Sequence, residues 1–447
     1  MPITIAAKEA SAHLTLQQRW FQLCVLVVAS GAIYPVLYLR QNFEISLLNT
    51  FDMSSSQLGE CYSILGIVFT ACFLPSGWLA DKTRPRWLLA GSMLATGLLA
   101  FWFATVPTLG NVKIIFGLWG ITTGLTFWGA LIKGVTLLAP HDKQSSFFGV
   151  LEGGRGLVEA ILASLALAIF AYFLQGSAAG ASDPDSTRSA MVATIVMYAS
   201  VCCLLAPIVL MTIRVPGGDP SNPSAGDNAK VDGGRLKDDL LILIRNRSLW
   251  LSALCVLAGY QMFWATYSFS GLLQTVFGMG AVAAGTLTVA KLWMRPVGAI
   301  VAGLLGDRFK IELSLAVLML VAAAGLAALP HLSPTSAVSM IMVSIVMIGL
   351  LTYGIRGIYW ATLDSCGVPA TIKGLAIGVI SIVGYLPDIY LPILKNGCFD
   401  LWGGNAGYVA YYSFLAAGGV GGSAAAWALH RRAQQQQPSA VSGAALS

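Results

Sequence analysis

Stretches of about twenty apolar residues recur along this chain, separated by short polar turns. A helix of that length crosses the hydrocarbon core of a bilayer, whereas the strands of a membrane barrel would be shorter and would alternate in polarity. Only 10% of the 447 residues are charged and the mean hydropathy is +0.75, whereas about a quarter of the residues of a soluble domain are charged. The sequence therefore predicts an all-α membrane protein surrounded by lipid.

Twelve such stretches are expected to be transmembrane helices, in two halves of six. The halves are residues 1–213 and 249–430. Between them lies a polar linker, 214–248, with a short amphipathic piece near 236–245, and residues 431–447 are expected to be a disordered tail. The expected helices run from residue 20 past residue 38 and over 57–80, 87–106, 112–138, 147–175, 190–213, 249–275, 283–306, 312–329, 337–362, 375–395 and 407–429.

The basic residues of the turns are distributed unevenly. Seventeen Lys and Arg fall on the side that carries the N-terminus, the linker and the tail, and three fall on the other side, Lys113, Arg188 and Lys395. Basic residues concentrate in cytoplasmic loops. We therefore expect both termini to be cytoplasmic and the protein to be a multi-pass protein of the cytoplasmic, or inner, membrane.

Several other functional classes lack the residues they need. The eight cysteines form no CxxC pair, the four histidines lie outside the expected helices, and no phosphate-binding loop of the ATPase type is present. We expect no metal, cofactor or enzymatic activity, no nucleic-acid partner, and a monomer.

One charged turn between two apolar stretches, GWLADKTRPR at residues 77–86, has a weaker echo, GLLGDRFK, at 303–310. A glycine permits close helix contact, an acid can meet a helix N-terminus or a basic partner, and basic residues stay at the interface. Such a turn would hold the cytoplasmic face closed in one state. The expected gate residues are Gly77, Asp81, Arg86, Asp307 and Arg308.

The turn at 77–86 resembles the signature between helices two and three of the major facilitator superfamily, Gly-x-Leu-Ala-Asp-Arg-x-Gly-Arg-Lys. Gly77, Leu79, Ala80 and Asp81 match it, and Arg84 replaces a glycine. The resemblance implies a secondary transporter with two six-helix halves, alternating access and a substrate site between the halves at mid-membrane.

A narrower likeness covers about fifty residues, from YLRQNF to the Pro85-Arg86 ending of the turn. It is similar to the organophosphate:phosphate antiporter branch, the glycerol-phosphate and hexose-phosphate transporters. Arg40, Asn42 and Phe43 match a run in the first helix of that branch, whose arginine binds substrate phosphate. The branch has a second phosphate-binding arginine in its seventh helix, at a position that falls near Phe263 here, and this helix contains no arginine.

Charged residues inside the apolar stretches are expensive and point to function. The embedded bases outnumber the acids, which predicts an anion site, because a guanidinium offers a planar fork of donors to carboxylate, phosphate or sulfonate. Arg40 either binds the substrate anion or extends to the interface, and Glu44, one turn on, could pair with it. The bases are Arg40, Lys133, Arg155, Lys291, Arg295 and Arg356, and the acids are Glu44, Glu60, Glu152, Glu159 and Asp388.

Glu152, Arg155 and Glu159 share one helix face, either as a relay that couples proton and anion movement or as a structural ion-pair cluster. Lys291 and Arg295 share a face one turn apart and repel each other unless an acid or anion lies between them. We expect Asp388 to be that acid or a protonation site. Pro387 beside it should break the helix.

Aromatic residues surround some of these bases. Arg356 has Tyr353, Tyr359 and Trp360 close by in sequence, and Lys133 occupies a similar depth in the first half. The two bases either flank a central anion or bind loops at the cytoplasmic end. The stretch 259–269 carries an aromatic stripe with one glutamine, and these side chains either line the cavity or pack between helices. They are Tyr260, Gln261, Phe263, Trp264 and Tyr267.

The sequence thus predicts a secondary active transporter of a small organic anion, a carboxylate, phosphate ester or sulfonate, driven by a proton or a counter-anion. The alternatives are a transporter of an inorganic anion, nitrate or phosphate, and a transporter-like sensor of a sugar phosphate. The expected substrate-binding residues are Arg40, Arg356, Arg295, Lys133, Tyr260, Gln261, Trp264 and Tyr359, and the expected proton-coupling or ion-pair residues are Glu152, Arg155, Glu159 and Asp388.

Overall fold

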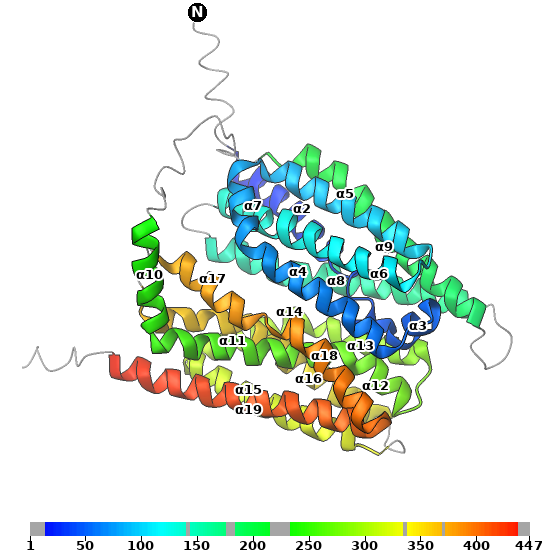
Figure 1. Ribbon diagram of the computed structural model, residues 1–447. Coiled ribbons are helices and arrows are strands. Elements are labelled where there is room, and N and C mark those ends of the chain that lie inside the picture. Colours follow the sequence, from blue (N-terminus) through cyan, green and yellow to red (C-terminus); the bar gives the residue numbers. More distant parts are fainter. Residues whose placement is uncertain are drawn as a thin grey trace, which may run out of the picture. The chain divides into compact units, whose positions relative to one another are not determined.

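The computed structural model describes residues 14–139, 144–175, 184–214, 233–333, 338–368 and 372–436. Within these ranges the regular structure is entirely helical (Figure 1). Nine helical segments there are long and apolar enough to cross a membrane: 85–104, 109–138, 147–174, 184–212, 247–275, 281–306, 311–331, 338–366 and 375–402. The membrane character is therefore confirmed, while the count of twelve spans stays a prediction.

The chain forms two compact units that differ from its sequence halves. Unit 1 contains residues 1–229, 267–296 and 388–397, and unit 2 contains residues 230–266, 297–387 and 398–447. Two pieces of the second sequence half, 267–296 and 388–397, thus belong to unit 1, and part of the expected linker, 230–248, belongs to unit 2. Unit 1 therefore draws segments from both halves of the sequence.

Unit 1 is built mainly from helices of the first sequence half. The helices α5 (Pro85–Ala104) and α9 (Pro184–Thr212) run side by side, as do α2 (Leu16–Ile33) and α8 (Gln144–Gln175) (Figure 1). α4 (Ser55–Lys82) packs against α6 (Leu109–Gly120) and the π-helical segment η1 (Ile121–Trp128), which continues as α7 (Gly129–Leu138). The helices α12 (Phe269–Thr275) and α13 (Ala281–Leu292) pack on α3 (Arg40–Phe51).

Unit 2 contains α10 (Gly233–Arg245), α11 (Arg247–Ala265), most of α14 (Met294–Phe309), α15 (Ile311–Ala328), α16 (Val338–Ile358), α17 (Lys373–Gly384) and α19 (Gly404–Gln436). The helix α19 packs along both α15 and α11. The expected amphipathic piece near 236–245 is confirmed as α10, whereas residues 215–232 of the linker lie outside the described residues.

Most ends of the expected helices agree with the structure to within a few residues. Three do not, because α9 begins at Pro184 and not near 190, α18 ends at Trp402 and not near 395, and α19 ends at Gln436, inside the expected tail. Several of the helices are also interrupted. The first expected helix is wrong as a continuous element, because α2 ends at Ile33 and a turn over residues 34–39 precedes α3. Pro35 lies in that turn and cannot donate a backbone hydrogen bond. The expected break at Pro387 is confirmed, since α17 ends at Gly384 and α18 (Pro387–Trp402) begins at the proline.

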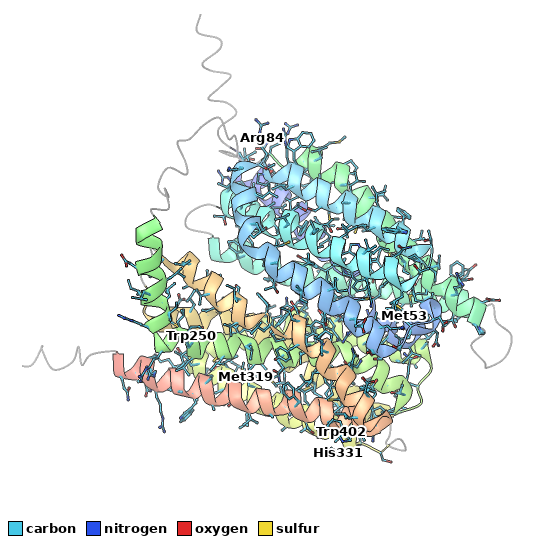
Figure 2. All side chains as sticks on the ribbon, in the orientation of Figure 1. Met53, Arg84, Trp250, Met319, His331 and Trp402 are labelled. Carbon is cyan, nitrogen blue, oxygen red and sulfur yellow. The ribbon has the colours of Figure 1, made fainter. Side chains whose placement is uncertain are left out.

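Successive turns of the chain lie at opposite ends of each unit, as the sequence predicts. In unit 1, Arg84 lies at one end of the helices and Met53 at the opposite end (Figure 2). In unit 2, Trp250 lies at one end, and His331 and Trp402 lie at the other (Figure 2). Each unit is therefore crossed repeatedly by helices that run from end to end.

Candidate functional site

The helix α3 is short and polar, and its first turns are buried inside unit 1. Arg40, Gln41, Asn42 and Glu44 are exposed by 2%, 3%, 7% and 3%. Phe43 between them has non-helical backbone angles, so the first turn of α3 is kinked. A run of buried polar side chains at this depth must find partners within the protein, and such runs mark functional sites in membrane proteins.

Arg40 lies within a group of tyrosines. Its guanidinium carbon is 4.6 Å from the centre of the Tyr62 ring, and the Tyr62 hydroxyl donates to the carbonyl of Leu37 at 2.8 Å. Tyr38 stacks between Tyr62 and Tyr267, with ring centres 5.9 Å and 5.2 Å apart. Arg40 is therefore held inside unit 1 against an aromatic wall, which contradicts the alternative of an arginine that extends to the interface.

Glu44 forms a buried ion pair with Lys395 of α18. The side chains of Lys395 and Glu44 are exposed by only 4% and 3%. Glu44 therefore pairs with a base of a distant helix, and the placement of Lys395 in an outer turn is wrong. Because α18 continues to Trp402, Lys395 lies inside a helix and not at its end.

Asp388 begins α18 beside the break that Pro387 creates, and it is exposed by 6%. The backbone of α18 passes very close to α4 here, because a Cβ on Gly66 would lie 2.5 Å from the Asp388 carbonyl oxygen. The Ser63 hydroxyl donates to the carbonyl of Ile389 at 3.2 Å. Asp388 is also close enough to Tyr38 to interact with it electrostatically.

Several buried polar atoms around α3 have no hydrogen-bond partner among the described residues. They are Gln41 Nε2, Asn42 Oδ1, Glu44 Oε2 and Ser268 Oγ. Such atoms are rare in folded proteins, where each costs about 1–3 kcal/mol. Ser268 follows Tyr267 of the aromatic stack, and the Ser270 hydroxyl donates to the Asn42 carbonyl at 3.0 Å, so α12 and its preceding turn belong to this layer.

The second cluster of charges in unit 1 joins α8 to the start of α14. Arg155 Nη1 lies 3.3 Å from Glu152 Oε1, and Arg295 forms ion pairs with Glu159 and, at 3.9 Å, with Glu152. The acid expected beside Arg295 is therefore Glu159 and not Asp388. The shared helix face predicted for Glu152, Arg155 and Glu159 agrees with this arrangement.

Glycines permit the close approach of the helices that form this cluster. A Cβ on Gly156 would lie 2.7 Å from Arg295 Cδ, and a Cβ on Gly154 would lie 2.6 Å from Val27 of α2. Lys291 on α13 is fully buried and lies 5.6 Å from the centre of the Phe269 ring. The cluster thus consists of three buried bases and two acids, of which Glu152 is half exposed.

In unit 2, Arg356 lies among aromatic rings. Its guanidinium carbon is 4.3 Å from the centre of the Phe263 ring and 5.7 Å from that of Tyr260. Tyr260 packs edge-on against Tyr385, and Phe263 packs against Tyr353. Aromatic rings surround Arg356 as expected. The rings that its guanidinium contacts, Phe263 and Tyr260, belong to α11 and not to the sequence next to Arg356.

Other predicted binding residues take structural positions. Gln261 donates to the carbonyls of Phe414 and Leu415 on α19 at 3.4 and 3.5 Å, so it joins α11 to α19. Lys133 donates to the carbonyl of Ala80 at 2.7 Å, near the end of α4, which is the arrangement that the cytoplasmic-end alternative describes. Trp264 and Tyr359 are buried, with 1% exposure each.

The predicted gate is described in part. Arg308 is exposed and lies 5.7 Å from the ring of Phe309, and Arg86 lies 5.7 Å from the ring of Trp87. No atom outside its own helix comes within 4 Å of a Cβ placed on Gly77, so the close helix contact expected there is not seen. The side chains of Asp81 and Asp307 lie outside the described part of the chain.

Sequence reasoning missed Lys395 and the stack of Tyr38, Tyr62 and Tyr267. A signal for Lys395 exists, because the apolar character of its stretch resumes after it in CFDLW. Nothing in the sequence indicates that the three tyrosines meet, since they lie on three different helical segments.

Buried charge in unit 1 is unbalanced. Among its described side chains, five bases and two acids are less than 9% exposed: Arg40, Arg155, Lys291, Arg295 and Lys395 against Glu44 and Asp388. Glu159, whose side chain is 16% exposed, reduces the excess without removing it. The interior of this unit is therefore electropositive.

Known proteins show the same architecture. Relatives in Escherichia coli are the inner membrane protein YqcE, 28% identical over 387 residues (85% of this chain and 87% of the relative), and the inner membrane protein YihN, 23% identical over 432 residues (94% and 97%).

The fold is similar to those of a nucleoside transporter, NupG (TM-score 0.66, 15% identity, 94% of this chain and 100% of that chain), and a D-xylose-proton symporter (0.66, 16%, 91% and 97%). It is also similar to that of a bacterial homologue of the human lysosomal transporter Spinster (0.64, 16%, 94% and 97%). Residues 20–392, most of the chain, match the family described as Major Facilitator Superfamily. The protein is thus a secondary transporter that belongs to the Major Facilitator Superfamily.

Proposed function

We propose that this transporter carries a small organic anion, a carboxylate, phosphate ester or sulfonate, across the inner membrane, with both chain termini on the cytoplasmic side. The observation that carries the proposal is the excess of buried bases over buried acids in unit 1. Buried charges of one sign repel each other, and an added opposite charge with good hydrogen-bond geometry offsets the penalty. A substrate anion would supply that charge.

The aromatic surroundings favour an organic anion over an inorganic one. Arg40 lies against the tyrosine stack of unit 1, and Arg356 lies against Phe263 and Tyr260 in unit 2. Ligand sites for organic molecules combine apolar and aromatic walls with a few polar groups that fix orientation. Nitrate or inorganic phosphate has no carbon body to use such walls.

Two sources of energy are compatible with a secondary transporter of this kind. In proton symport, a carboxylate among Glu152, Glu159 and Asp388 would gain a proton as Arg155 or Arg295 engages the substrate. In anion exchange, a second anion would replace the first and these carboxylates would keep their ion pairs. A pH gradient that drives uptake into proteoliposomes supports symport, whereas acceleration by preloaded anion without any response to pH supports exchange.

Thermal unfolding of the purified protein tests the substrate class. The probes are succinate, glycerol phosphate and isethionate as organic anions, nitrate as an inorganic anion, and uridine and D-xylose as the neutral molecules that the solved relatives suggest. A ligand at 100 times its Kd stabilises the folded state by about 2.7 kcal/mol. We expect at least one organic anion to raise the unfolding temperature, and neither neutral molecule to do so.

Variants assign the effect to the buried bases. Arg40→Gln should abolish the stabilisation, while Lys113→Gln should retain it, because Lys113 forms a partly exposed ion pair with Glu60. Stabilisation by uridine or D-xylose and by none of the anions would refute the proposal. Stabilisation by nitrate alone would favour the inorganic alternative.

A further inference from the structure

Two Lys–Glu ion pairs among the described residues differ greatly in burial. Lys113 and Glu60, which join α6 to α4, have side chains exposed by 35% and 51%. Lys395 and Glu44, which join α18 to α3, have side chains exposed by 4% and 3%. A pair that deep is a poor device for stability, because the cost of removing two charges from water can exceed their attraction. The burial of this pair therefore indicates a functional role.

A second cation, Arg40, lies near this ion pair. Arg40 lies one helical turn before Glu44 on α3 and is close enough to Lys395 to interact with it electrostatically. Like charges that are buried together repel each other unless an anion lies between them. In the structure, the Glu44 carboxylate is the anion paired with Lys395.

Only one of the two carboxylate oxygens of Glu44 accepts a hydrogen bond from a described residue. Its Oε1 accepts from Lys395, but its Oε2 is buried and has no hydrogen-bond partner among the described residues. A carboxylate whose main role was structural would be expected to have both oxygens satisfied. A tethered carboxylate that fits imperfectly can be exchanged for an anion that fits better.

We infer that Lys395 and Arg40 form the anion-binding centre of this transporter, and that the Glu44 carboxylate occupies this centre until the anionic group of the substrate replaces it. The inference rests on the proposed function, transport of an organic anion. It assigns Lys395 to substrate binding and makes Glu44 a competitor built into the protein.

The two ends of the ion pair then affect affinity in opposite directions. Removal of the Glu44 charge removes the competitor, so Glu44→Gln should bind the anion more tightly. Removal of the Lys395 charge removes a ligand, so Lys395→Gln should bind it more weakly. If the pair were only a strap between α3 and α18, breaking it at either end would change affinity in the same direction.

The experiment measures the Kd of succinate, glycerol phosphate and isethionate by calorimetric titration of the purified full-length protein. For a probe that binds the wild type, we expect Glu44→Gln to lower the Kd about tenfold and Lys395→Gln to raise it about tenfold or more, since one charge-assisted hydrogen bond corresponds to such factors. Glu60→Gln and Lys113→Gln, the matched controls at the half-exposed pair, should leave the Kd unchanged.

The double variant Glu44→Gln/Lys395→Gln replaces Lys395→Gln in the test if that single variant fails to fold, because it does not leave the Glu44 charge buried without its lysine. It should bind the probe at least about tenfold more weakly than Glu44→Gln, since these two variants differ only in the Lys395 charge. An unchanged or raised Kd in Glu44→Gln, or equal shifts in both single variants, would overturn the inference while the proposed function stands. If no organic anion binds the wild type, the proposed function itself fails.

Discussion

The ion pair between Arg295 and Glu159 offers a quantitative test of how the first sequence half holds the start of α14. The side chains of Arg295 and Glu159 are exposed by 8% and 16%, so little water remains to compensate either charge alone. Removing one partner of a buried pair costs about 3–5 kcal/mol. Because the Glu159 carboxylate keeps some exposure to water, we expect Arg295→Met to reduce the free energy of unfolding by about 3 kcal/mol, near the lower end of that range.

The double variant Arg295→Met/Glu159→Met separates the loss of a pair from the loss of packing. Replacing both partners of a buried pair by apolar residues of similar volume is often neutral or stabilising. We therefore expect the double variant to lie within about 1 kcal/mol of the wild type, so that it recovers about 2 kcal/mol or more of the stability lost in Arg295→Met. The measurement is equilibrium unfolding in mixed micelles, followed by tryptophan fluorescence.

The half-exposed pair of Lys113 and Glu60 is the matched control for this experiment. Its side chains are exposed by 35% and 51%, and exposed pairs contribute about 0–1 kcal/mol. Lys113→Met should therefore change the free energy of unfolding by less than about 1 kcal/mol. If Arg295→Met cost no more than Lys113→Met, or if the double variant were no more stable than Arg295→Met alone, burial would not determine the strength of the pair.

Three further substitutions test other contacts. Gly156→Ala should displace Arg295 and lower the unfolding temperature, because the new Cβ would lie 2.7 Å from Arg295 Cδ, whereas Gly153→Ala, with no neighbour within 4 Å, should not. Gly66→Ala should cost about 1–3 kcal/mol in the same unfolding assay by forcing α4 away from the Asp388 carbonyl, and equal stability of Gly66→Ala and Gly91→Ala would contradict this contact. Arg356→Gln should raise the Kd of the organic anion about tenfold in calorimetric titration, while Arg431→Gln, which also removes an arginine beside an aromatic ring, should leave it unchanged.

The positions of most helices could be predicted because a bilayer imposes one rule on every span. A stretch of apolar residues must be long enough to cross and must satisfy its backbone internally. The expected helix over 87–106 corresponds to α5 (Pro85–Ala104), and the one over 312–329 corresponds to α15 (Ile311–Ala328). Interruptions are harder to predict, since Pro75 lies within the continuous α4, while Pro35 lies in a turn between two helices.

The charged residues of the candidate site could be identified, but their partners could not. A charge within an apolar stretch stands out in any sequence, which is why Arg40, Arg295 and Arg356 were recognised. Partner choice depends on tertiary packing, as Glu44 shows by pairing with Lys395, 351 positions away. Lys395 was misplaced because the end of an apolar stretch is a poor guide to the end of its helix.

The interruptions and the buried charges of unit 1 have a common physical basis in α4. Where a helix is broken, carbonyl groups lose their backbone partners and must accept hydrogen bonds from elsewhere. Two consecutive residues of α4 bind backbone carbonyls next to the two breaks, since Tyr62 donates to the carbonyl of Leu37 in the turn before α3, and Ser63 donates to the carbonyl of Ile389 in the first turn of α18. The same two segments carry Arg40, Glu44 and Lys395. A single helix thus holds the backbone beside both breaks, and these breaks, of which the sequence predicts only the one at Pro387, position the two segments whose charges meet.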